Sequence, residues 1–173
     1  FVLTKAAGGE FYDLAGEKTD LAFCPLREID SAADLTWAVT WLEDLCSLNG
    51  LTVTPKHRNA LTQALLQLRL SPSRTLTELS ANVQDLDVRE ALQFYTLSGP
   101  LGQLLDADED VLTSGRFLTF ETENLLQLDD EAVIPVLLYL FRRIEKRLDG
   151  SPTLVSLDEA WAYLRNDVFR CDG

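Results

Sequence analysis

Two adjacent carboxylates, Asp158 and Glu159, follow an apolar run near the C-terminal end of the chain. The run (TLVSL, residues 153–157) has the composition of a short buried strand. A buried parallel strand that ends in an acid pair is typical of a Walker B element of a nucleotide site. In such a site Asp158 would hold the Mg²⁺ shell, and Glu159 would orient or deprotonate the attacking water.

A simpler interpretation of the same residues remains open. Acids after a strand are common, and Asp158 would then cap a helix that begins near Ala160. The sequence also has no Gly-x-x-x-x-Gly-Lys-Ser/Thr phosphate loop among its 173 residues. If the acid pair belongs to a nucleotide site, we therefore expect the phosphate-binding half to lie outside this sequence.

Other candidates for chemistry are weaker. Glu121 and Glu123 follow a second strand-like run and could face the same crevice, although a solvated or structural role is the more ordinary interpretation. His57 is the single histidine and lies beside Arg58 at the start of a helix, so we expect a structural or solvent-facing role for it. The three cysteines show no C-x-x-C spacing, which argues against a zinc site.

The segments around the acid pair predict where the pair would lie in a β-sheet. Residues 117–121 have strand character, and a long helix follows, capped by Asp129 or Asp130 and ending at Gly150. Together with a strand at residues 154–157 they predict a βαβ unit with parallel strands and a right-handed crossover. Ligands of open parallel sheets bind beyond the carboxyl ends of the strands. The inward residues of the helix would be Val133, Leu137, Leu140, Phe141, Ile144 and Leu148.

Between residues 30 and 105 the apolar period is that of helices. The starts of four helices are marked by Asp30 or Ser31, Thr54 with Pro55, Thr75 and Asp87. Short helices with single apolar stripes must pack on each other or on a sheet. Before them, residues 11–12 and 21–23 are strand candidates. We therefore divide the chain into a β-rich part (1–29), a helical insertion (30–112) and a βαβ part (113–173).

The composition is that of a globular protein with an acidic balance. The 173 residues are 46% hydrophobic and 25% charged, enough for one domain. The net charge of −13 argues against direct nucleic-acid binding, because that affinity comes from neutralised phosphates. The cations between Arg142 and Arg147 are interpreted as the solvated end of a helix. No apolar run approaches the ~20 residues of a membrane span, and the unpaired thiols suit a reducing compartment, so we expect a cytoplasmic protein.

Five runs of the sequence belong together: AGGEFYDL (7–14), TVTP (52–55) with Arg58, YTLSGPLGQLLDA (95–107), IPVLLYLF (134–141) with RIE (143–145), and LDEAW (157–161) with VFR (168–170). In combination they resemble the TrbE-type conjugal transfer ATPases, the large motor family of type IV secretion systems. The resemblance extends from end to end of the chain, and its third and last runs are the most distinctive.

The resemblance implies a RecA-like α/β fold in which an all-helical insertion lies between the phosphate loop and Walker B. This chain would be a predominantly helical, central fragment of such a P-loop ATPase domain, and the absence of Met agrees with a fragment. Asp158 would be the Mg²⁺-site acid and Glu159 the catalytic base of ATP hydrolysis. The parent protein would bind ATP and Mg²⁺, whereas this chain, without Walker A, would bind neither tightly and would be inactive alone.

The parent implied by the resemblance hydrolyses MgATP to power DNA or protein transfer, or pilus assembly. It would act as a homo-oligomer together with other subunits of a type IV secretion complex. Its place would be the cytoplasmic face of the bacterial inner membrane, which it would reach only by docking to this complex. One alternative of another class remains. The chain could be a non-catalytic helical interaction module of a secretion complex, because it is acidic and contains no phosphate loop.

Overall fold

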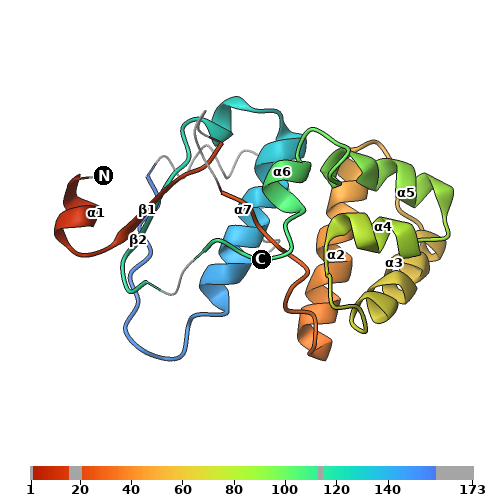
Figure 1. Cartoon of the computed structure of the whole chain (residues 1–173), viewed down its shortest axis with the longest axis horizontal. Coiled ribbons are helices and arrows are strands. Elements are labelled where there is room, and N and C mark those ends of the chain that lie inside the picture. Colours follow the sequence, from red (N-terminus) through yellow and green to blue (C-terminus); the bar gives the residue numbers. More distant parts are fainter. Residues whose placement is uncertain (1, 16–20, 113–114, 159–173) are drawn as a thin grey trace, which may run out of the picture.

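The computed structural model describes residues 2–15, 21–112 and 115–158. Its central element is α7 (Asp130–Glu145), which lies between a small parallel sheet and a group of helices (Figure 1). The sheet consists of β1 (Glu10–Asp13) and β2 (Leu118–Glu121), and α1 (Val2–Ala6) precedes it. Within the described ranges, no helix combines the length and the apolar character that crossing a membrane requires.

The group of helices, called the helical block here, has the four members predicted from the sequence. Their starts are fixed by local hydrogen bonds. The side-chain oxygens of Ser31, Thr54 and Thr75 accept the backbone N–H three residues later, as predicted. The last helix begins one residue earlier than predicted, because Asp85 caps it. The members are α2 (Ala32–Leu48), α3 (Pro55–Leu68), α4 (Leu76–Asn82) and α5 (Leu86–Leu92).

The chain turns sharply after the helical block, through η1 (Gln93–Tyr95) and the short α6 (Gly102–Leu105), which the sequence did not predict. A Cβ atom at Gly99 would lie 2.3 Å from the carbonyl oxygen of Gln93, and one at Gly102 would lie 2.0 Å from that of Thr96. Both distances are far inside van der Waals contact. Only glycine therefore fits at these two positions of the turn.

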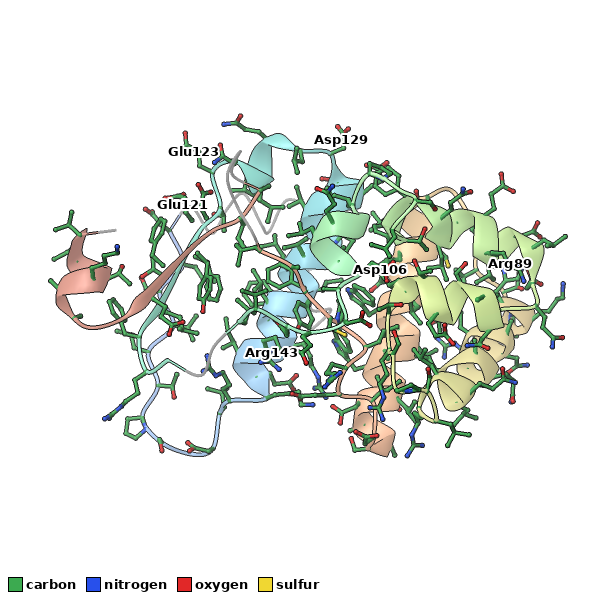
Figure 2. All side chains as sticks on the ribbon, in the orientation of Figure 1. Arg89, Asp106, Glu121, Glu123, Asp129 and Arg143 are labelled. Atoms are coloured by element: carbon green, nitrogen blue, oxygen red, sulfur yellow. The ribbon has the colours of Figure 1, made fainter. Side chains whose placement is uncertain are left out.

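Asp106 fastens this turn to the helical block (Figure 2). Its side chain is almost completely buried and accepts the N–H of Thr77 at 2.9 Å, the hydroxyl of Thr77, and the N–H of Leu97 at 2.7 Å. A buried carboxylate is stable only when donors of this kind surround it. Sequence reasoning did not single out Asp106, although it lies within the distinctive run at residues 95–107.

The strands β1 and β2 pair in parallel, with Glu10 opposite Leu118 and Asp13 opposite Glu121. The strand predictions at residues 11–12 and 117–121 are therefore confirmed. Two parallel neighbours need a crossover connection, and here residues 14–117, with the whole helical block, form it. The predicted strand at residues 21–23 is wrong. The N–H of Phe23 instead donates to the carbonyl of Leu104 at 2.7 Å, so this segment pairs with the α6 region.

Helix α7 ends five residues before the predicted end at Gly150. Beyond it, the N–H groups of Arg147 and Leu148 bond to carbonyls three residues back, and this tighter winding ends the helix. Leu148 is 53% exposed and not inward as predicted. Val133, Leu137 and Leu140 are buried, which confirms the predicted inward face of the first three turns.

The predicted strand at residues 154–157 is also wrong for the described structure. These residues form no strand, and Leu154 is 93% exposed. A strand of a parallel sheet is normally covered on both faces and paired along its edges. Among the described residues β2 has β1 as its parallel neighbour, and no strand pairs with residues 154–157. The βαβ unit predicted around α7 is therefore not formed here.

A proline determines how α7 is joined to the helical block. Pro135 has no N–H, so the carbonyl of Glu131 lacks its partner within the helix. The hydroxyl of Tyr95 donates to this carbonyl at 3.0 Å and accepts the side-chain amide of Asn49 at 2.8 Å. The ring N–H of Trp41 donates to the carbonyl of Pro135 itself at 3.1 Å. Two buried aromatic side chains thus satisfy carbonyls of α7 from outside the helix.

We expect Tyr95→Phe to lower the free energy of unfolding by about 1–3 kcal/mol, because it leaves the Glu131 carbonyl buried without a donor. In a Pro135→Ala background, the backbone N–H of the new alanine would supply that donor, and the loss should fall below about 1 kcal/mol. Denaturant unfolding of the four proteins of this double-mutant cycle measures both values. Equal losses in the two backgrounds would contradict the assignment of the Tyr95 bond.

The exposed apolar side chains at residues 154–157 predict self-association. Leu154, Val155 and Leu157 are 93%, 47% and 49% exposed, and among the described residues no third strand extends the sheet of β1 and β2. We expect oligomers in light scattering at high concentration, and fewer of them in a Leu154→Ser/Leu157→Ser variant. A clean monomer of the unaltered chain would count against this expectation.

Candidate functional site

The carboxyl ends of β1 and β2 bring acids to one edge of the sheet. Asp13 lies opposite Glu121 in the parallel register, and each residue ends its strand. The N–H of Glu123 donates to Glu121 at 3.2 Å, and the amide of Asn124 donates to Asp13 at 3.2 Å. In Figure 2, Glu121 and Glu123 lie at the upper left of the molecule, and Asp129, the N-cap of α7, lies at its upper middle. Glu121 and Glu123 are exposed, so this edge presents carboxylates to solvent.

The predicted catalytic pair lies at the end of the described chain. Asp158 is exposed and follows the exposed residues 151–157. Glu159 and the helix start expected near Ala160 lie outside the described residues. The structure therefore places Asp158 after β2 and α7 in chain order, and the roles of Asp158 and Glu159 stay predictions.

Cations at the C-terminal end of α7 form what we call the α7 ion-pair cluster. The side chains of Arg142 and Arg143 are only 16% and 25% exposed, so the predicted solvated face is wrong for these two residues, whereas Lys146 lies at an exposed position. Each of them pairs with carboxylates from other segments. Their partners are Glu28 before α2, Asp34 in the first turn of α2, and Asp110 after α6.

The three carboxylates of the α7 ion-pair cluster respond differently to this environment. Burial opposes ionisation of Asp34, but hydrogen bonds from Ser31, Lys146 and Arg142 outweigh it and lower its pKa. A hydrogen bond from Lys146 lowers the pKa of Glu28. At Asp110 burial dominates over the nearby guanidinium and raises the pKa. The cluster therefore combines two firmly ionised acids with one whose charge is disfavoured by burial.

A cleft of about 260 Å³ lies beside the α7 ion-pair cluster and includes the rings of Trp37 and Tyr139. The Tyr139 hydroxyl donates to Asp110, and the Arg142 guanidinium lies 5.7 Å from the centre of the Trp37 ring. Because acids and cations of the lining match in number, the cleft has no net attraction for an anion such as a phosphate. The charged lining residues are Arg27, Arg142, Arg143, Lys146, Glu28, Asp34, Glu109 and Asp110.

A second polar cluster joins the starts of α3 and α5. Potential metal-ligand atoms of His57, Asp85 and Asp87 lie within 4.8 Å of one another. However, Nδ1 of His57 accepts the N–H of Thr54 at 3.3 Å, so a neutral imidazole carries its proton on Nε2 and has no lone pair there for a metal. Asp85 caps α5 and binds Lys56 at 2.7 Å. The geometry thus favours helix capping, and the predicted structural role of His57 is confirmed.

Comparison with models of known protein families gives no match for this chain. Comparison with individual proteins gives similarity along almost its entire length. The chain is 48% identical over 172 residues to a probable conjugal transfer protein TrbE of Sinorhizobium fredii, covering 97% of the chain and 26% of that protein. It is 43% identical over 174 residues to the conjugal transfer protein TrbE of Rhizobium radiobacter, covering 97% of the chain and 21% of that protein.

A more distant similarity points in the same direction. The chain is 27% identical over 177 residues to the type IV secretion system protein virB4 of Bartonella quintana, covering 98% of the chain and 22% of that protein. The chain therefore spans only about a quarter or a fifth of the length of the proteins it matches.

Proposed function

Because the chain belongs to the TrbE family of conjugal transfer proteins, we propose that it is part of a motor ATPase of conjugation or type IV secretion. The parent protein would hydrolyse MgATP to power DNA or protein transfer, or pilus assembly. The observation that carries this proposal is the acid pair Asp158–Glu159, which follows a strand and a long helix in the order of the chain. The chain matches a TrbE protein over 97% of its own length.

The proposed fold is a RecA-like α/β domain with the helical block as its insertion. Two features of the described residues support it. Parallel strands β1 and β2 are connected through the helical block, and their acids lie at the same edge of the sheet, where ligands of parallel sheets bind.

In this proposal Asp158 holds the Mg²⁺ site and Glu159 is the catalytic base, while the phosphate loop comes from another part of the parent. Carboxylate oxygens are the protein ligands that Mg²⁺ prefers, so the acid pair and the acidic edge of the sheet fit the ion chemically. ATP and Mg²⁺ are thus cofactors of the parent. The chain without a phosphate loop would bind neither tightly.

The proposed partners are other subunits of a conjugation or type IV secretion complex, together with further copies of the parent protein. The relatives are named for conjugal transfer and type IV secretion. We propose that the parent works at the cytoplasmic face of the inner membrane and reaches it by docking to the complex. The net charge of −13 supports contact with proteins and not with nucleic acid for this part of it.

A second candidate function is a non-catalytic helical interaction module. It is favoured by the absence of a phosphate loop from the sequence and by the helical block, whose helices carry their own caps and share one core. In this case Asp158 would act only as a helix cap.

Calorimetry with MgATP separates the two functions. We expect no binding by this chain and binding by a longer protein that includes the phosphate loop of the parent. An Asp158→Asn variant of the longer protein should lose the Mg²⁺ dependence of that binding. If neither protein binds MgATP, the ATPase proposal fails and the interaction module is favoured.

For the parent protein, Glu159→Gln should reduce ATP turnover by about 10²-fold or more, because the amide cannot accept the proton of the attacking water. ATP binding should persist. The matched control is Glu90→Gln on the exposed face of α5, which should leave turnover unchanged. Near-normal turnover of the Glu159 variant in a phosphate-release assay would remove Glu159 from the role of base.

A further inference from the structure

Helix α7 is joined to the helical block by contacts of different kinds at its two ends. At the N-terminal end, Tyr95 and Trp41 donate to the carbonyls of Glu131 and Pro135, at 3.0 and 3.1 Å. Both aromatic side chains are at most 1% exposed. These bonds join uncharged groups, so dissolved ions have little effect on them.

At the C-terminal end of α7 the contacts are ionic. Within the α7 ion-pair cluster, Arg142 lies 2.7 Å from Asp34, and Lys146 lies 2.6 Å from Glu28 and 3.0 Å from Asp34. Arg143 lies 3.0 Å from Glu28 and 3.7 Å from Asp110. Asp34 lies in α2, so its pairs with Arg142 and Lys146 hold the helical block to α7, while Glu28 and Asp110 belong to the segments before and after the block. Pairs that are partly open to solvent weaken as the salt concentration rises.

Packing at this second end is also incomplete. The cleft of about 260 Å³ lies between α7, the start of α2 and the segment around Asp110. The Nε atom of Arg142 is buried there without a hydrogen-bond partner, the one such side-chain atom found in the described part of the chain. An unsatisfied buried donor reduces the stability of the closed arrangement. At the other end, the side chains of Trp41 and Tyr95 are themselves fully buried.

We propose that α7 and the helical block form a conformational device with a fixed pivot and a releasable latch. The pivot is the pair of aromatic hydrogen bonds around Pro135, and the latch is the α7 ion-pair cluster. When the latch opens, the first turns of α2 separate from the end of α7 while the two helices stay joined at the pivot. Because α7 leads directly into the segment that carries Asp158, opening moves the helical block relative to that segment.

Distances between spin labels test the device in the full-length protein, with the native cysteines replaced. One pair of labels, at Ala33 and Leu148, spans the latch end, and a second pair, at Ser47 and Asp130, spans the pivot end; all four positions are exposed. In an Arg143→Gln/Lys146→Gln variant we expect the first pair to gain a population at longer distance. The second pair should keep its original distance distribution.

A matched control removes an ion pair elsewhere. Lys56→Gln breaks the Lys56–Asp85 pair at the far side of the helical block and should change neither distance. In the unaltered protein, raising NaCl from roughly 0.05 to 1 M should reproduce the change at the latch pair alone, because added ions screen the cluster.

Two outcomes would overturn the proposal. If both label pairs move to longer distance, the helical block separates as a whole and has no pivot. If neither pair moves in the variant or at high salt, the ion pairs do not act as a latch. The salt series needs no substitution within the cluster, so it decides the question even if the Arg143→Gln/Lys146→Gln variant fails to fold.

Discussion

The missing N–H of Pro135 is the constraint on which the packing of α7 against the helical block depends. It leaves the carbonyl of Glu131 in a buried place without a partner inside α7, and such a group must find a donor elsewhere. Tyr95 supplies it and is itself held by Asn49 at the end of α2. Because Pro135 has no N–H, three segments of the chain, namely α7, the segment of Tyr95 and the end of α2, meet at the buried Tyr95 hydroxyl.

The parallel pairing of β1 and β2 explains why a helical block interrupts the sheet. Parallel neighbours cannot be joined by a tight turn, so a long connection must return the chain to the same edge. Residues 14–117 make that return and supply most of the one core, which they share with Tyr12, Leu125 and α7. The same topology places Asp13 and Glu121 side by side at the carboxyl edge. An acidic edge and a helical insertion are therefore two consequences of one chain path.

The sequence predicts well those features whose cause is local. Ser31, Thr54 and Thr75 accept N–H groups three residues away, so their positions could be recognised without knowing the fold. Features that depend on distant partners could not be derived in the same way. The segment at 154–157 has strand composition, yet a strand forms only where a neighbour pairs with it. The local sequence does not distinguish Asp106 from a surface acid, because its environment depends on hydrogen bonds from Thr77 and Leu97.

The distribution of cations also bears on which kinds of molecule this chain can contact. The chain has 15 basic residues against 28 acidic ones, and many of the described cations are engaged within the fold. Arg58 pairs with Glu43, Arg74 with Asp30, and the cations at the end of α7 with their own cluster. A cation that is already neutralised cannot release counterions from a nucleic-acid backbone. The outward surface is left with the acidic surplus, so a macromolecule that docks on it gains most when its own contact surface is basic.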